Sequence, residues 1–366
     1  MNARHRWVFV SMVFLSALSF AQQAVSPASS ATSAPQEPAL SPRPTAAENP
    51  VEGKIKLEVV VVDKAGNPVD SLNVKDFTLF DNNQPAKIAS FRAIPRVPAV
   101  GDPPLSVALV LDTVNEGFQR VSFARQEITR VLRANGGLLA QPVSIILLTN
   151  DGLSAHLDPS TDGNGLADQL AQLDSKLRTS NRAQGNWGDI ERFTFSMQMF
   201  DNILNDQEAR TGRKLLIWIG RGWPMLNTQA FELSAEAQQR YFDAIVQLSA
   251  RFRESNVVLS SVAGGEPDPQ SFLYRTFLKP VVAAKKTNPG NLALKVLATQ
   301  SGGWILGPDN DLAGQINKCI SGSAPYYILS FDPGHADRAN EYHDLRVQID
   351  QPGLSAKTSS GYYNQP

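Results

Sequence analysis

Short apolar segments alternate with helical patterns through the middle of this chain, and this alternation restricts the fold more than any other feature. Four apolar runs have strand length, at residues 106–111, 143–148, 215–219 and 257–262. Helix-period patterns accompany them, at residues 118–133, 165–177, 193–204 and 235–252. Strands that alternate with helices of this length predict a parallel sheet covered on both faces. We therefore predict an α/β domain over residues 104–322, with a doubly wound, mostly parallel sheet.

The segments on either side of this region have the pattern of antiparallel strands. Residues 51–95 hold three short strands separated by turns at 63–68 and 81–85. Residues 323–366 return to strand patterns, with no helical pattern to cover them. We predict that these C-terminal strands pair with residues 51–95, so that one antiparallel β unit flanks the α/β domain.

The N-terminus has the features of an export signal. A basic head at Arg4, His5 and Arg6 precedes an apolar stretch, and Ser19-Phe20-Ala21 offers a small-residue cleavage site. We predict a signal peptide over residues 1–21 and a disordered Ala/Ser/Pro-rich linker over residues 22–50. The alternative is a retained membrane anchor, but the stretch is short against the roughly 20 apolar residues that a span needs. No transmembrane span is expected after cleavage, and the chain is expected in the periplasm or outside the cell.

Composition excludes some classes of partner and chemistry. The chain has 34 basic and 35 acidic residues and no Lys/Arg cluster, so we expect no nucleic-acid partner. Its one cysteine, Cys319, has no histidine or basic cluster near it in sequence and is expected to be a small buried side chain. There is no Gly-x-Ser-x-Gly, P-loop or dinucleotide fingerprint. Without a paired nucleophile and base, we predict a protein that is not an enzyme.

The first apolar strand ends on an acid, and this marks the candidate site. In an open α/β sheet, residues just past the carboxyl ends of the strands line the ligand crevice. Asp112 occupies such a position and is followed by Val114, Asn115 and Glu116. We predict that a ligand or partner is met at this place.

Three segments add to the strand–helix alternation and to Asp112: the opening segment 57–69, the segment 211–224, and the tail 326–333 with its final Gly361-Tyr362. Together these motifs resemble von Willebrand factor type A (vWA) domains, and more narrowly the VWFA-related domain proteins of the Acidobacteria. The resemblance spans residues 51–363 and implies a vWA/Rossmann-like fold.

The resemblance also implies a metal-ion-dependent adhesion site, which this chain matches only in part. The family holds a divalent cation with Asp-x-Ser-x-Ser, a threonine and a later aspartate. Here Asp112 matches the first aspartate, Val114 and Glu116 stand at the serine positions, and Arg221 stands where the later aspartate belongs. The repulsion between an arginine and a divalent cation about 4 Å apart is on the order of kcal/mol, even with generous screening. We therefore predict a degenerate site without a metal, in which Arg221 forms an ion pair with Asp112.

Two alternatives remain open for this site. Asp112, Asn115 and Glu116 offer oxygens from which a variant Mg²⁺ or Ca²⁺ cage could be rebuilt, which gives a metal-dependent adhesion domain. A cryptic hydrolase that uses Asp112 or Glu116 is the third reading.

The leading hypothesis is an exported, non-catalytic binding module without a cofactor. Its partner would be a protein or a component of the cell envelope, bound by loops at residues 112–117, 181–189 and 220–227. Trp223 follows a strand at the carboxyl edge of the sheet and is expected on the binding rim. The expected site residues are those of the two loops that flank the sheet edge: Asp112, Asn115, Glu116, Arg221 and Trp223.

Two further patterns have competing interpretations. The segment 158–165 resembles half of a calcium loop, but Gln169 stands where the chelating glutamate is needed, so we predict a loop followed by a helix N-cap. His156, His335 and His343 lack the spacing of a zinc pair. His335 and His343 are expected to be solvated residues of a loop or a strand edge.

Overall fold

The computed structural model describes residues 54–97, 99–173, 186–225, 233–264 and 271–366. The expected signal peptide and linker lie outside these ranges, as do residues 181–185 and 226–227 of the expected binding loops. Among the described residues, no helix has both the length and the apolar character that crossing a membrane requires.

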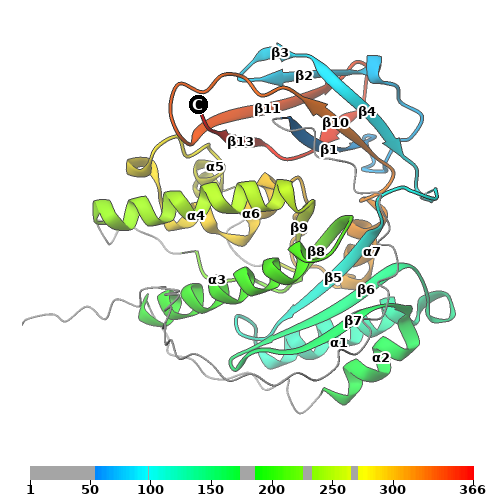
Figure 1. Ribbon diagram of the computed structural model, residues 1–366. Helices are drawn as coiled ribbons and strands as arrows, with labels where there is room; N and C mark the ends of the chain where they lie inside the picture. Colours follow the sequence, from blue (N-terminus) through cyan, green and yellow to red (C-terminus); the bar gives the residue numbers. More distant parts are fainter. Residues whose placement is uncertain (1–53, 98, 174–185, 226–232, 265–270) are drawn as a thin grey trace, which may run out of the picture. The chain divides into compact units, whose positions relative to one another are not determined.

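The central sheet has five strands in the order β7-β6-β5-β8-β9 (Figure 1). Its middle strand β5 (Leu105–Asp112) pairs in parallel with β6 (Leu138–Thr149) and β8 (Arg213–Ile219). Strand β9 (Val257–Val262) is parallel to β8, and the edge strand β7 (Gly152–Asp162) is antiparallel to β6. The mostly parallel sheet that the sequence predicts is therefore confirmed.

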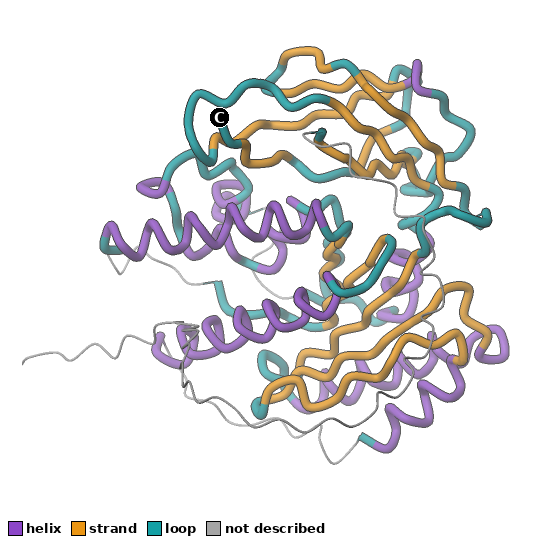
Figure 2. The backbone as a smooth tube through the Cα atoms, viewed as in Figure 1, coloured by secondary structure: helices purple, strands orange, loops and turns teal. Residues whose placement is uncertain are grey.

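Helices cover both faces of this sheet because each buried strand sends alternate side chains to opposite sides. Leu109 and Leu111 pack toward α1 (Phe118–Arg133), α2 (Gly163–Gln172) and α7 (Leu312–Ser321). Val110 and Trp218 pack toward the other face. That face is covered by α3 (Asn186–Glu208), α4 (Ala235–Glu254) and α6 (Leu294–Gln300), and the short helix α5 (Phe272–Phe277) packs on α6. Figure 2 shows the helices on either side of the strands.

The remaining strands form two four-stranded antiparallel sheets. One has the order β12-β1-β10-β4, with bounds Ser355–Lys357, Ile55–Val62, Tyr326–Phe331 and Ile88–Ile94. The other has the order β13-β11-β2-β3, with bounds Gly361–Asn364, Glu341–Ile349, Phe77–Asp81 and Gln84–Ala86. Their shared core includes Leu57, Leu79 and Leu329. N-terminal and C-terminal strands thus pair with each other, as in the register Leu57↔Leu329.

A buried ion pair joins this antiparallel unit to the α/β sheet. Arg213, at the start of β8, has its Nε 2.9 Å from Oε2 of Glu58 in β1. The side chains of Arg213 and Glu58 are only 5% and 12% exposed. The Arg213 guanidinium also lies 4.4 Å from the ring centroid of Tyr326 in β10 and donates to the carbonyl of Ser323. One arginine therefore ties three segments together at this junction.

The segment around Asp158 differs from its expected loop. It continues β7 as far as Asp162, and the side chain of Asp162 then caps α2 by accepting a hydrogen bond from the Gly165 amide at 2.9 Å. The N-cap prediction is confirmed, whereas the loop prediction is wrong. The strand escapes notice in the sequence because β7 is an edge strand, half exposed, and lacks the apolar run of the buried strands.

Candidate functional site

The candidate site lies where β5 and β8 end side by side. Leu111 pairs with Ile219, so Asp112 and Gly220 come next to each other at the carboxyl edge of the sheet. Gly220 has a φ of +131°, and a Cβ there would lie 3.2 Å from Cγ of Glu116 and 3.4 Å from Cβ of Asp112. The positive φ, which other residues rarely adopt, and the tight approach to Glu116 therefore favour glycine at this position.

Asp112 is fully buried and accepts four hydrogen bonds. Its Oδ1 accepts from the backbone amides of Val114 at 3.0 Å and Asn115 at 3.1 Å. Its Oδ2 accepts from Nδ2 of Asn115 at 2.9 Å and from the indole Nε1 of Trp218 at 3.0 Å. Burial raises the pKa of Asp112, and these hydrogen bonds offset part of that rise. The carboxyl group organises the turn from β5 into α1.

These contacts do not fit a metal ion at Asp112. A carboxylate offers about four lone-pair directions, and four N–H donors already use them. The neighbouring hydroxyl of Thr113 donates to the carbonyl of Leu148 at 2.9 Å, and Val114 has no ligand oxygen. Within the ranges that the structure describes, no group of three or more His, Cys, Asp or Glu side chains is arranged to hold a metal. Among the described residues, the side chains around Asp112 therefore do not present the hydroxyl and carboxylate set that the resemblance implies.

The amide nitrogen of the Asn115 side chain is also engaged within the protein, whereas its Oδ1 is buried and accepts no hydrogen bond from a described residue. This Nδ2 donates to Oγ of Ser196 in α3 at 3.1 Å, besides its bond to Asp112. This expected site residue therefore links the β5–α1 turn to α3.

Glu116 differs from Asp112 because only one of its oxygens accepts a hydrogen bond from a described residue. Oε1 accepts from the backbone amide of Arg221 at 2.6 Å. Oε2 is buried and accepts none among the described residues, and its nearest cation is Nη1 of Arg120 at 3.9 Å. Burial raises the pKa of Glu116 by more than the Arg221 amide and the charges of Arg221 and Arg120 lower it.

Glu116 lines a cavity of about 590 Å³ next to the sheet edge. This volume falls in the range of about 300–1,000 Å³ typical of ligand pockets. Apolar side chains make up much of the wall: Leu111, Val121, Phe123, Ala124, Ile219 and Leu312. The charged lining residues are Asp112, Glu116, Arg120 and Asp309. The cavity thus combines an apolar wall with a surplus of acidic groups.

Two expected site residues lie elsewhere than the sequence analysis places them. The guanidinium of Arg221 forms no ion pair with Asp112, whose oxygens are used by N–H donors, and the residue is exposed. Trp223 is 4% exposed, packs 5.1 Å from the Trp218 ring centroid and donates to the carbonyl of Leu292 at 2.8 Å. Gly222, with a φ of +76°, turns the chain inward here, so Trp223 lies in the core and not on a rim.

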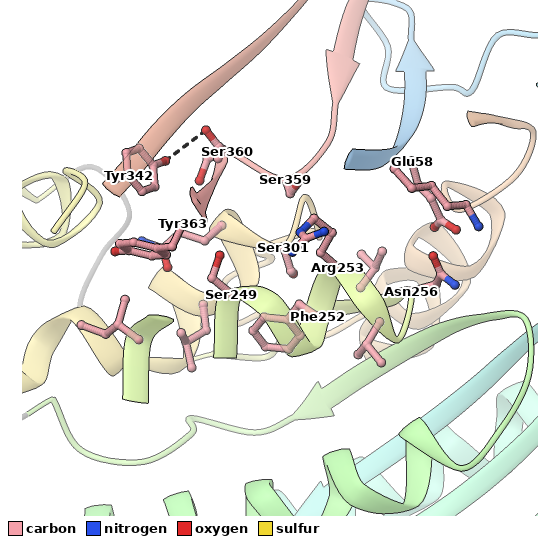
Figure 3. Close-up of a pocket in the computed structure, with 17 residues that line it drawn as sticks. Glu58, Ser249, Phe252, Arg253, Asn256, Ser301, Tyr342, Ser359, Ser360 and Tyr363 are labelled. Atoms are coloured by element: carbon pink, nitrogen blue, oxygen red, sulfur yellow. Dashed lines mark hydrogen bonds between the residues drawn. The ribbon is translucent and has the colours of Figure 1, made fainter. Parts of the chain in front are cut away.

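A second cavity lies where α4 meets the antiparallel unit. Figure 3 shows Arg253, Ser301 and Ser359 near its middle, with Glu58 and Asn256 on one side and Tyr342 and Tyr363 on the other. The Tyr342 hydroxyl donates to the carbonyl of Ser360 at 3.1 Å (Figure 3), and burial raises the pKa of Tyr342 to about 12. This cavity holds only about 60 Å³, which is room for a few water molecules and too little for a ligand.

The prediction that His343 is solvated is wrong. The residue is 2% exposed, and its Nδ1 lies 2.8 Å from Oδ1 of Asp81 in β2. The Tyr362 hydroxyl donates to Oδ2 of Asp81 at 2.8 Å, and the Gly334 amide donates to the same oxygen at 3.1 Å. These contacts bind β2, β11 and β13 together. His343 lies an even number of residues from Leu345 and Ile349 along β11, so period-two spacing places it on the same inward face as these two apolar residues.

Replacing Tyr362 with phenylalanine is expected to lower the free energy of unfolding by about 1–3 kcal/mol, because a buried carboxyl oxygen loses its hydroxyl donor. Tyr342→Phe removes a bond to a backbone carbonyl instead and is expected to cost about 0.5–1.5 kcal/mol. Urea unfolding of both variants measures the difference. A Tyr362→Phe variant no less stable than Tyr342→Phe would show that the Asp81 contact contributes little.

No protein-family profile matches this sequence, and no curated protein matches it significantly. Among solved structures, the human COPII-coat protein Sec24c shows 9% identity and a TM-score of 0.34, covering 72% of this chain and 44% of that one. Manganese-loaded TRAP protein of Plasmodium vivax shows 9% identity and a TM-score of 0.30, covering 74% and 96%. The pilus adhesin SpaC of Lactobacillus rhamnosus GG, in its open conformation, shows 8% identity and a TM-score of 0.32, covering 79% and 48%. This chain thus spans less than half the length of Sec24c and SpaC.

Proposed function

We propose that this chain is an exported, non-catalytic binding module with a vWA-like fold, which holds a partner in the cavity beside Glu116 without a metal ion. One observation carries the proposal: a cavity of about 590 Å³ lies at the carboxyl edge of the sheet, beside an Asp112 whose lone pairs are used inside the protein. This edge is where open α/β sheets meet their ligands. Export rests on the N-terminal sequence alone.

The lining of the cavity favours binding over catalysis. Among its described lining residues there is no Ser, Thr, Cys, Lys or His, so no nucleophile of these types is paired with a base. A hydrolase would depend on Glu116 or Asp112, and Asp112 is enclosed by its four donors. The remaining groups are suited to holding a side chain of a partner.

Blocking the cavity tests this function. Asn310 is exposed and lines the cavity, so Asn310→Trp is expected to fill it without disturbing the core. A panel of immobilised peptides of mixed sequence is screened with the wild-type protein in a chelating buffer. Peptides that bind are expected to lose more than about 90% of their signal with Asn310→Trp, which corresponds to a loss of ~1.4 kcal/mol or more.

The control is Gln169→Trp, which places the same side chain on an exposed position of α2 away from the cavity. It is expected to bind like the wild type. Binding that survives Asn310→Trp, or that appears only when Mg²⁺ or Ca²⁺ is added, contradicts the proposal. Cleavage of peptide, ester or phosphate substrates that Glu116→Ala abolishes would instead support the hydrolase.

A further inference from the structure

The charges that line the cavity indicate what kind of group it accepts. Three acidic residues line it, Asp112, Glu116 and Asp309, against one basic residue, Arg120. Such an acidic hollow with low-dielectric walls concentrates positive charge. Since Asp112 is saturated by internal donors, Glu116 and Asp309 are the acids that remain to meet a partner.

Glu116 is the more informative of these two acids. Its side chain is 5% exposed, and Oε2 accepts no hydrogen bond from any described residue. The 3.9 Å to Nη1 of Arg120 is longer than a hydrogen bond, and the Arg120 side chain is 56% exposed. Because the Arg120 end of this pair is exposed, water screens the attraction, and the long side chain loses entropy when it is fixed, so the pair is weak. A buried carboxylate oxygen thus lacks the donor that its burial calls for.

Resting on the proposed function, we infer that the group bound in this cavity is the side chain of an arginine on a partner protein. Its guanidinium donates to Oε2 of Glu116, and its methylene stem lies along the apolar wall that includes Val121 and Leu312. Phe123, which is 39% exposed and lines the cavity, adds an aromatic face for the cation.

An acidic partner group fits the same cavity poorly. It would lie beside Glu116 and Asp309, and only Arg120 among the described lining residues would attract it. Arg221 contributes its backbone amide to Glu116, and its side chain is not part of the lining. The inferred partner therefore contributes a positively charged group, whereas a partner that binds a metal ion would contribute a negatively charged carboxylate.

The test uses small probes and a reporter inside the site. N-acetyl-arginine methylamide is titrated into the full chain, with the N-acetyl-citrulline analogue as a neutral probe of nearly the same shape. The readout is the indole N–H resonance of Trp218, which donates to Asp112 next to the cavity. A Trp218→Phe sample assigns this resonance. The arginine probe is expected to shift it saturably, and the citrulline probe is expected to bind about tenfold more weakly or worse.

Three variants distinguish the binding of arginine by Glu116 from the binding of any group in the cavity. Glu116→Gln keeps the acceptor for the Arg221 amide but removes the charge, and it is expected to weaken arginine binding about tenfold or more. Glu236→Gln removes an exposed charge on α4 and is expected to change nothing. Asn310→Trp is expected to abolish the response to both probes.

The outcomes distinguish a failure of the inference from a failure of the proposed function. Equal binding of both probes that Asn310→Trp removes would overturn the arginine assignment and leave the cavity as a binding site. A response that Asn310→Trp leaves intact would overturn both. No saturable response to the arginine probe, or preferential binding of an N-acetyl-aspartate amide, also overturns the arginine assignment.

The pH dependence of arginine binding provides an independent test. Arginine stays charged, so its binding follows the ionisation of Glu116. The charged groups near Glu116 are Asp112 at the end of β5, Arg120 in α1, Arg221 after β8 and Asp309 in the loop before α7. Burial raises the pKa of Glu116 above its ordinary value. The response is therefore expected to fall, as pH is lowered from 7, at a higher pH than the ~4.3 of an ordinary glutamate. A response that is constant down to pH ~4.3 contradicts a role for this carboxylate.

Discussion

Replacing Asp112 with alanine is expected to lower the free energy of unfolding by about 3–5 kcal/mol in a buffer that contains a chelator. The substitution leaves the Trp218 indole, the Asn115 amide and two backbone amides without their acceptor in a buried site. Urea unfolding measures the loss. Asp168→Ala is a suitable control because Asp168 forms an exposed pair with Arg133 and is expected to matter little.

This experiment also separates two roles for Asp112. If Asp112 were a metal ligand, the metal-free protein would hold a buried carboxylate without its counter-charge, and alanine would relieve that cost. The variant would then be at least as stable as the wild type in chelator. A large loss of stability without any metal supports the structural role, and an unchanged or increased stability contradicts it.

Breaking the ion pair between Glu58 and Arg213 is expected to have an effect of similar size. Arg213→Met leaves Glu58 in β1 buried without its partner and is expected to cost about 3–5 kcal/mol. The double variant Glu58→Leu/Arg213→Met is expected to recover most of this loss, because apolar replacements of buried pairs are often neutral. Urea unfolding of the two single variants and the double variant forms a double-mutant cycle.

The same variants have a defined pH dependence. Burial raises the pKa of Glu58 in the folded chain by more than Arg213 and the nearby lysines lower it. The folded state therefore holds its proton more tightly than the unfolded state, so stability falls as pH rises above ~4.3 toward the raised pKa. Arg213→Met widens this window, and its deficit is expected to be larger at neutral pH than in acid. A deficit that is independent of pH would show that the charge of Glu58 is not its cause.

The sequence predicts the layers of this fold because side-chain periodicity is a local property. The runs 106–111 and 215–219 contain the apolar residues that fill β5 and β8, and the pattern at 118–133 coincides with α1. The same local pattern marks Asp112, since it ends a buried strand. Side-chain periodicity does not determine the register between strands that are far apart in the chain.

That register decides which group meets Asp112. Val110 pairs with Trp218, which brings the indole of a residue 106 positions away to the carboxyl group in place of the expected Arg221. The sequence predicts Trp223 on the binding rim, but the glycine turn at Gly222 after β8 directs the chain into the core. The sequence predicts Glu116 as a site residue, but it does not predict that only one of its oxygens accepts a hydrogen bond. That bond comes from the Arg221 amide, which lies near Glu116 because β5 and β8 end side by side.

Calorimetric titration of the wild-type protein with Mg²⁺, Mn²⁺ and Ca²⁺ tests the central claim, that this site works without a metal, most directly. The account predicts no saturable heat from any of the three ions, and the same result for Glu116→Gln. Micromolar binding by the wild type that is lost in Glu116→Gln and in Asp112→Asn would contradict it. A metal would then use the Asp112 oxygens that accept from N–H donors and the Glu116 oxygen that we propose for the partner.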